Sequence, residues 1–290
     1  MDSLRGLGVA LATPFDVDNK IDYEALLKLL KHTASNGANY WVVMGSTGEA
    51  ITLSNQEQDE VLTFVKNNNP NNLPIVFGLG GSNTFALIKR LEELDLSGVT
   101  AILSSSPAYN KPTQEGIKAH FRLLADKSLV PIILYNVPSR TCSNMEASTT
   151  IELASHKNII GIKEASGNVQ QAEEIIASTS DDFMLISGDD MLTPALIKIG
   201  ATGLISVLAN ALPNHFNQLT TLALNGNIAE SQKFVNNLNE LSDLMYVEGN
   251  PAGIKELLAQ QGICSNSVRL PLVLATKSLQ ADISSAIRKL

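Results

Sequence analysis

Eight short apolar segments recur along the chain, each followed by a polar or glycine-rich loop and then by a stretch with helical spacing. They are GVALATPF (8–15), YWVVMGS (40–46), PIVFGLG (74–80), AILSSSP (101–107), PIILYNV (131–137), IIGIKEA (159–165), FMLISGD (183–189) and GLISVLA (203–209). Continuous apolar runs are typical of parallel strands buried on both faces. Eight of them alternating with helices predict an α/β protein, a (β/α)8 TIM barrel of the usual size of about 250 residues.

The segments between these runs place leucine, isoleucine and valine three or four residues apart, which is the pattern of helices with one buried face. Examples are residues 23–37, 58–69, 85–94 and 170–180. Ser54 and Glu57 have the spacing of a capping box, and Thr113 stands where another helix is expected to begin.

The composition favours one large aliphatic core, since 44% of the residues are hydrophobic, 17% charged and only 5% aromatic. The part from residue 226 onwards has a helical pattern, and no charged or Pro/Ser-rich linker precedes it. We therefore expect residues 1–225 to form the barrel. Residues 226–290 are expected to form a C-terminal helical extension packed on it, with helices in 244–263 and 273–290.

The charge and the cysteine count argue against several classes of function. The chain has 21 Lys and Arg against 29 Asp and Glu, a net charge of −8, so a nucleic-acid partner is not expected. No apolar stretch reaches the ~20 residues that span a bilayer, and no secretion signal is recognisable, which favours a cytoplasmic protein without a membrane partner. Cys142 and Cys264 suit neither a disulfide framework nor a metal site.

Polar residues at the C-terminal ends of the strands are the candidates for a functional site, because barrel active sites lie there. They gather in residues 45–49, 135–140 and 161–164. Side chains alternate along a strand, so Lys163 is expected to share a face with Gly161 and to point into the barrel if that face is the inner one. Tyr135, on the neighbouring strand about 4.8 Å away, is then within reach of the Lys163 amine.

A lysine inside an aliphatic barrel has a lowered pKa, and its neutral amine is a nucleophile towards carbonyl groups. Each residue also has a plain structural interpretation. Lys163 can extend to solvent or pair with Glu164, Tyr135 can be a core residue, Arg140 a solvated cation, and Ser46 and Thr47 part of an ordinary tight turn. Their joint placement at strand ends favours the functional interpretation.

Five motifs extend the argument beyond single residues: GSTGE, SPAYNKPTQEG, YNVPSRT, GIKEAS and SGDD, in this order. With them the chain resembles the dihydrodipicolinate synthase/N-acetylneuraminate lyase superfamily of class I aldolases. The resemblance runs from ALATPF near residue 10 to NPAGIKELL and to RLPL at 269–272. Within the superfamily, Arg140 resembles the arginine of the synthases that binds the carboxylate of the aldehyde substrate.

The resemblance implies a catalytic role for four residues. Lys163 is expected to form a Schiff base with the ketone of pyruvate, and Tyr135 to shuttle protons. Ser46 is expected to link Tyr135 to Tyr109 in a hydroxyl relay, with Tyr109 entering from a neighbouring subunit. The protein is therefore expected to be a homotetramer or homodimer.

Substrate binding is implied for three further residues. Ser46 and Thr47 are expected to hold the pyruvate carboxylate, Arg140 the carboxylate of L-aspartate 4-semialdehyde, and Ile205 to line the pyruvate pocket. The imine withdraws electrons, so the pyruvate methyl group loses a proton and the enamine attacks the aldehyde. No metal or organic cofactor is expected.

Two departures from the family pattern concern substrate and regulation. Synthases more often carry Thr where this chain has Ser46, while the lyases often have GSTGE. Members inhibited by lysine tend to carry His and Tyr where this chain has Asn55, Gln58 and Ala108.

Two alternative functions remain at this point. One is another pyruvate aldolase, such as a sialic-acid or keto-deoxy-sugar lyase. The other is a barrel without catalysis that serves as a scaffold, although the presence of Lys163 and Tyr135 argues against it.

Overall fold

Eight parallel strands close into a barrel in sequence order, with β1 hydrogen-bonded to β8. The computed structural model describes residues 2–290. Each predicted apolar segment overlaps one strand, and only β1 begins before its segment, so the expected (β/α)8 barrel is confirmed. The strands are β1 (Gly6–Ala10), β2 (Tyr40–Val43), β3 (Ile75–Gly78), β4 (Ala101–Ser105), β5 (Ile132–Asn136), β6 (Ile159–Glu164), β7 (Met184–Ser187) and β8 (Gly203–Ser206).

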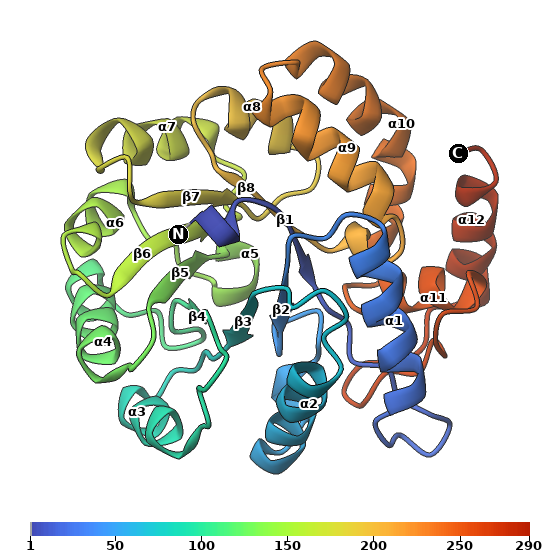
Figure 1. Cartoon of the computed structure of the whole chain (residues 1–290), viewed down its shortest axis with the longest axis horizontal. Coiled ribbons are helices and arrows are strands. Elements are labelled where there is room, and N and C mark those ends of the chain that lie inside the picture. Colours follow the sequence, from blue (N-terminus) through green and yellow to red (C-terminus); the bar gives the residue numbers. More distant parts are fainter. Residues whose placement is uncertain (1) are drawn as a thin grey trace.

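Helices surround the barrel and cover the outer faces of its strands (Figure 1). They are α1 (Tyr23–Ser35), α2 (Asn55–Asn67), α3 (Thr84–Glu93), α4 (Gln114–Lys127), α5 (Pro138–Thr141), α6 (Ala147–Ala154), α7 (Val169–Ser178), α8 (Thr193–Lys198), α9 (Pro213–Leu224), α10 (Ile228–Val247), α11 (Ala252–Gln260) and α12 (Lys277–Ile287), with the 3-10 turns η1 (Asp2–Leu4), η2 (Ala50–Thr52) and η3 (Leu208–Asn210). Ser54 and Glu57 form the expected capping box at α2, and Thr113 caps α4.

A small apolar cluster, distinct from the large one between strands and helices, fills the inside of the barrel. It comprises Leu4, Ala10, Tyr40, Val42, Val76, Ala101, Leu103, Ile133, Met184, Ile186 and Ile205, with Tyr135 and Ile160 packed against it. Gly8 leaves room for it, because a Cβ atom there would lie 2.4 Å from the Tyr40 ring. Ile133 and Tyr135 are therefore on the inner face, as the alternation of side chains requires.

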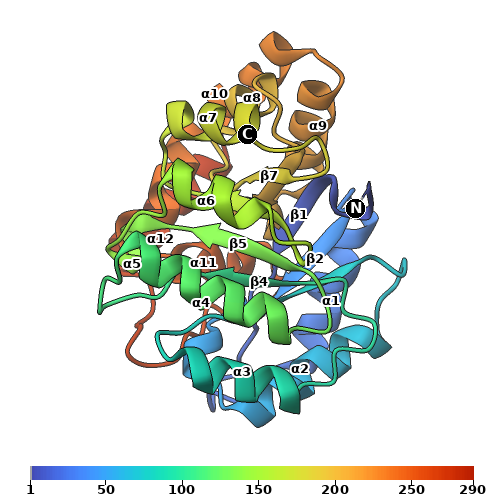
Figure 2. The same ribbon diagram turned by 90° about the vertical axis from the view of Figure 1, so that its left-hand side faces the viewer.

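The C-terminal helices pack on one another and on the barrel helices, with α10 against α8, α9, α11 and α12. The expected helical stretch 244–263 is divided, since α10 ends at Val247 and α11 begins at Ala252. Figure 2 shows the β5 arrow pointing to the end of the barrel where α5, α11 and α12 are drawn. The boundary at residue 226 stays a prediction.

No helix within residues 2–290 is both long and apolar enough to cross a membrane.

Candidate active site

Lys163 is buried inside the barrel near the C-terminal end of β6, with 5% of its surface exposed. It stands in register with Tyr135 on β5 and with Ile186 on β7, both of which belong to the inner face. Its Nζ lies 4.7 Å from the centre of the Tyr135 ring. The structure therefore brings Lys163 and Tyr135 together as expected from the sequence.

Neither plain interpretation of Lys163 holds in the structure. The side chain is too deeply buried to extend into solvent. Glu164, on the opposite face of β6, accepts hydrogen bonds from the side chains of Asn136 and Gln171 and from the backbone N–H of Ser166. The Glu164 carboxylate is thus already used in a separate network and is not the partner of Lys163.

The titration of Lys163 and Tyr135 suits attack on a carbonyl group. Burial lowers the pKa of Lys163 to about 8; the Asp190 carboxylate raises it, and the Arg140 guanidinium lowers it. A substantial fraction of the amine is therefore neutral just above neutral pH. Burial also raises the pKa of the Tyr135 phenol, so this group keeps its proton and can donate it.

Asp190, which sequence reasoning did not single out, lies in the loop after β7 and is 5% exposed. One oxygen, Oδ2, accepts hydrogen bonds from the backbone N–H groups of Val207 and Leu208 at 3.2 and 3.1 Å. The other, Oδ1, is buried and has no partner among the residues described. Burial raises the pKa of Asp190 to about 6, while Lys163 is among the groups that lower it. The SGDD motif was the available signal for this residue.

The loop after β2 carries Ser46 and Thr47 in a tight turn, in which the Glu49 N–H donates to the Ser46 carbonyl at 3.1 Å. A Cβ atom at Gly48 would lie 3.0 Å from the Leu11 carbonyl oxygen, so glycine permits the close approach to β1. Thr47 is buried, and the Ser46 side chain is exposed in the single chain.

Arg140 lies in α5, at the same end of the barrel, and its Nη2 donates to the backbone carbonyl of Asn250 at 3.2 Å. The Asn250 side chain donates from Nδ2 to Oγ1 of Thr47 at 3.1 Å. The structure thus connects Thr47 and Arg140, two of the three predicted carboxylate-binding residues, through a residue of the C-terminal extension. Asn250 was not predicted from the sequence.

A buried ion pair holds the end of the same loop. Nζ of Lys255, which is fully buried in α11, donates to Oε1 of Glu49 at 2.5 Å and to the Ser267 carbonyl at 2.9 Å. The backbone N–H of Arg269 donates to Oε2 of the same carboxylate at 3.0 Å. This contact was not predicted from the sequence, because a lysine in an amphipathic helix is usually exposed.

Ile205 and Tyr109 occupy very different places. Ile205 is buried in the inner cluster, as expected for a wall of the pocket. Tyr109 follows β4, has a positive φ of 70° and is 94% exposed, so within one chain it lies outside the barrel interior. The structure does not bring Tyr109 to Lys163 within the single chain.

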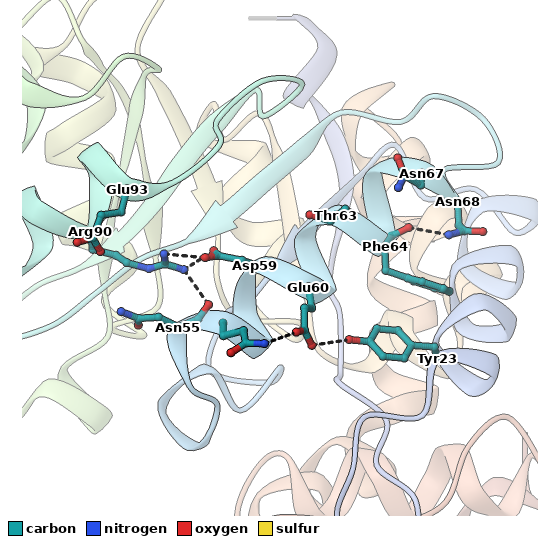
Figure 3. Close-up of a pocket in the computed structure, with 11 residues that line it drawn as sticks. Tyr23, Asn55, Asp59, Glu60, Thr63, Phe64, Asn67, Asn68, Arg90 and Glu93 are labelled. Atoms are coloured by element: carbon teal, nitrogen blue, oxygen red, sulfur yellow. Dashed lines mark hydrogen bonds and ion pairs between the residues drawn. The ribbon is translucent and has the colours of Figure 1, made fainter.

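A groove of about 750 Å³ lies elsewhere, on α1, α2 and α3 (Figure 3). Its side chains are engaged with one another: Arg90 pairs with Asp59, and the Tyr23 hydroxyl donates to Glu60 at 3.5 Å. None of the predicted site residues lines this groove.

Within residues 2–290, no cluster of His, Cys, Asp and Glu has an arrangement suited to a metal ion.

Residues 3–290 match the model of the dihydrodipicolinate synthetase family. The chain belongs to this family. Two relatives named 4-hydroxy-tetrahydrodipicolinate synthase come from Porphyromonas gingivalis and Cytophaga hutchinsonii. The first is 47% identical over 283 residues, which are 97% of this chain and 95% of the relative. The second is 43% identical over 286 residues, which are 99% of this chain and 96% of the relative.

A solved structure of a dihydrodipicolinate synthase, that from Acinetobacter baumannii complexed with pyruvate, has the same fold with a TM-score of 0.95. It is 32% identical, and the match covers 99% of this chain and 98% of that one. The expected membership of the dihydrodipicolinate synthase superfamily is confirmed, and with it the assignment of the chain as an enzyme of a lyase family. The names of the relatives favour the synthase over the sugar-lyase alternative.

Proposed function

We propose that this chain acts as a 4-hydroxy-tetrahydrodipicolinate synthase and condenses pyruvate with L-aspartate 4-semialdehyde in the biosynthesis of diaminopimelate and lysine. The observation that carries the proposal is the burial of Lys163 inside the barrel against Tyr135, with a pKa of about 8. The names of the relatives support the choice of reaction. With this biosynthetic role, we propose that the protein acts in the cytoplasm.

The reaction starts with attack of the neutral Lys163 amine on the ketone carbon of pyruvate. Loss of the former carbonyl oxygen as water leaves a cationic imine, which withdraws electrons from the neighbouring methyl group. The methyl group loses a proton, and the resulting enamine attacks the aldehyde carbon of the semialdehyde. Because the lysine itself provides the electron sink, the chemistry requires no metal or organic cofactor.

Tyr135 is the proposed proton shuttle, since its phenol keeps its proton beside the amine. Ser46 is the proposed link from Tyr135 to Tyr109 of a second copy of the chain. The almost complete exposure of Tyr109 and Ile51 supports this arrangement, as does the 76% exposure of Phe85, because large apolar side chains favour burial in an interface. We therefore propose a homodimer or homotetramer.

The two substrates are proposed to bind through their carboxylates. Ser46 and Thr47 hold the carboxylate of pyruvate at the turn after β2, and Ile205 forms part of the apolar wall beside it. Arg140 holds the carboxylate of the semialdehyde through a charge-assisted contact. Placement of these residues at the C-terminal end of the barrel supports both assignments.

Borohydride trapping tests this function. Incubation of the protein with pyruvate and borohydride should add one reduced pyruvyl group, and peptide mapping should place the adduct on Lys163. The adduct should disappear in Lys163→Ala and persist in Lys157→Ala, which changes an exposed lysine before β6. An adduct of unchanged yield in Lys163→Ala would exclude the proposed Schiff base. The rate of product formation from the semialdehyde is then compared with the rates of cleavage of sialic acid and keto-deoxy sugars. This comparison tests the identity of the aldehyde substrate.

A further inference from the structure

Asn250 is the residue that links the two carboxylate-binding positions of the proposed site. It lies between α10 and α11, donates from its side chain to Thr47 at 3.1 Å, and accepts from Arg140 on its backbone carbonyl at 3.2 Å. Thr47 and Arg140 belong to different barrel loops and share this partner. We propose that Asn250 is a positioning residue that fixes the distance between the two bound substrates. The proposal rests on the function proposed above.

The environment of Asn250 supports a role beyond ordinary packing. The residue is 7% exposed, and its Oδ1 atom is buried without a partner among residues 2–290. An unpaired buried amide atom costs free energy. Exchanging the amide oxygen and nitrogen does not remove this cost, because the Thr47 hydroxyl satisfies only one of the two atoms. The amide is thus kept in an unfavourable environment at the point where it holds Thr47.

The extension fixes the same loop at a second point, which makes the Asn250 link rigid. Lys255 and Arg269 both donate to the buried Glu49 carboxylate, two residues after Thr47. The guanidinium of Arg269 also pairs with Glu57 at the start of α2. The loop is therefore held on both sides of Gly48 by residues of the extension.

The spacing of the two carboxylates matters for the chemistry. The enamine carbon and the aldehyde carbon must approach to about 3–3.5 Å in the right orientation, and an error of about 1 Å is able to cost two orders of magnitude in rate. Thr47 and Arg140 anchor the remote ends of the two reactants. A shared partner converts two separate anchors into one rigid frame.

Steady-state kinetics of Asn250→Ala provide the first test. Both kcat/KM for pyruvate and kcat/KM for L-aspartate 4-semialdehyde should fall about tenfold. Asn266→Ala is the matched control, because the Asn266 amide donates to Glu256 at 2.7 Å within the extension. In this control both values should stay within twofold of wild type. Thermal unfolding of each variant separates loss of folded protein from loss of positioning.

Substitutions at Thr47 test the link from the other side and do not depend on the folding of Asn250→Ala. Thr47→Val removes the hydroxyl that binds Asn250, whereas Thr47→Ser keeps it. Thr47→Val should lower kcat/KM for the semialdehyde as well as for pyruvate, and Thr47→Ser should restore the value for the semialdehyde. Adding Asn250→Ala to Thr47→Val should cause no further loss for the semialdehyde, since both changes break the same link.

The possible outcomes separate this inference from the proposed function. Absence of a pyruvyl adduct and of condensation in the wild type would overturn the function. With an active wild type, two results would overturn the role of Asn250. One is a normal kcat/KM for the semialdehyde in Thr47→Val. The other is a fall in kcat/KM for the semialdehyde in the double variant that equals the product of the falls in the two single variants.

Discussion

Asp190, just after β7, and Lys163, near the end of the neighbouring strand β6, are both buried, and each shifts the pKa of the other. The carboxylate raises the pKa of the ammonium group, and the ammonium group lowers the pKa of the carboxylate. Burial acts in the opposite sense on each. Ammonium and protonated imine both carry one positive charge, so the same buried carboxylate is able to balance Lys163 before and after the proposed Schiff base forms.

The first prediction concerns the pH dependence of Schiff-base formation. Only the neutral amine attacks pyruvate, and the pKa of Lys163 is about 8. The trapping rate should therefore rise with pH up to about 8 and level off above it, and below about 7 it should fall roughly tenfold per unit. Rapid-quench borohydride trapping at saturating pyruvate measures this profile. A rate that does not change between pH 6 and 8 would contradict the assignment of this pKa.

The second prediction concerns Asp190→Asn. The amide oxygen can still accept the N–H groups of Val207 and Leu208, so the change chiefly removes the charge. Loss of a nearby negative charge lowers the pKa of Lys163, and the rising limb of the trapping profile should move down by about one pH unit or more.

The control for this change is Asp189→Asn in the same loop. The Asp189 carboxylate accepts the N–H groups of Met191 and Leu192, and it is not among the groups that act on the pKa of Lys163. Its profile should coincide with that of the wild type. Equal shifts in the two variants would mean that the loop conformation, and not the Asp190 charge, sets the profile.

The third prediction is a large loss of rate in Tyr135→Phe, because a positioned acid or base contributes about 10² to 10⁴. The condensation rate should fall by about 100-fold or more. Tyr23→Phe removes a hydroxyl from the groove on the outer helices and should have no effect. Steady-state rates with both substrates saturating decide the matter, and a Tyr135→Phe rate within about threefold of wild type would exclude the shuttle.

The fourth prediction separates the two substrates at Arg140. Arg140→Ala should lower kcat/KM for L-aspartate 4-semialdehyde about ten- to a hundredfold, the usual worth of a charge-assisted contact. The value for pyruvate should stay nearly unchanged, because the Asn250 side chain still holds Thr47. Arg122→Ala, at an exposed arginine paired with Glu152, is the control. A matching loss for both substrates would argue against a separate carboxylate site.

The fifth prediction is that L-lysine does not inhibit the enzyme. Lysine needs partners for its carboxylate and for both amines, and a charged ligand with unpaired groups binds poorly. Ala108 offers no polar side chain at a position where inhibited members of the family differ, and the Gln58 amide already donates to the carbonyls of Ala50 and Leu53. Activity should persist with lysine at millimolar concentration. Half-inhibition by lysine below about 1 mM, which corresponds to a binding free energy of about −4.1 kcal/mol, would show that lysine binds in a different pocket.

The sequence predicted the barrel and the place of Lys163 because both depend on local periodicity. Continuous apolar runs identified each strand, and alternation within β6 placed Lys163 on the same face as Gly161. The YNVPSRT and GSTGE motifs likewise lie at strand ends, so their residues could be assigned to one end of the barrel. The catalytic and binding roles of these residues stay predictions.

The SGDD motif pointed to Asp190, but the roles of Asn250, Asp190 and Lys255 could not be assigned from the sequence, because these roles depend on contacts between distant segments. Asn250 stands in what resembled one continuous helical stretch, and only the folded chain shows that its partner is Thr47. Lys255 has the sequence context of an exposed helical lysine, yet it is fully buried. The charge of Asp190 matters only because β7 closes beside β6.

The buried carboxylate of Glu49 has a consequence for the order in which the enzyme is made. Its two donors, Lys255 and Arg269, are 206 and 220 residues further along the chain. Synthesis runs from the N-terminus, so the turn that is proposed to bind pyruvate leaves the ribosome long before either donor exists. Until then this charge must stay in water, because a buried carboxylate without a partner is too costly. The nascent barrel therefore gains the finished form of this proposed site only after Arg269 has been translated.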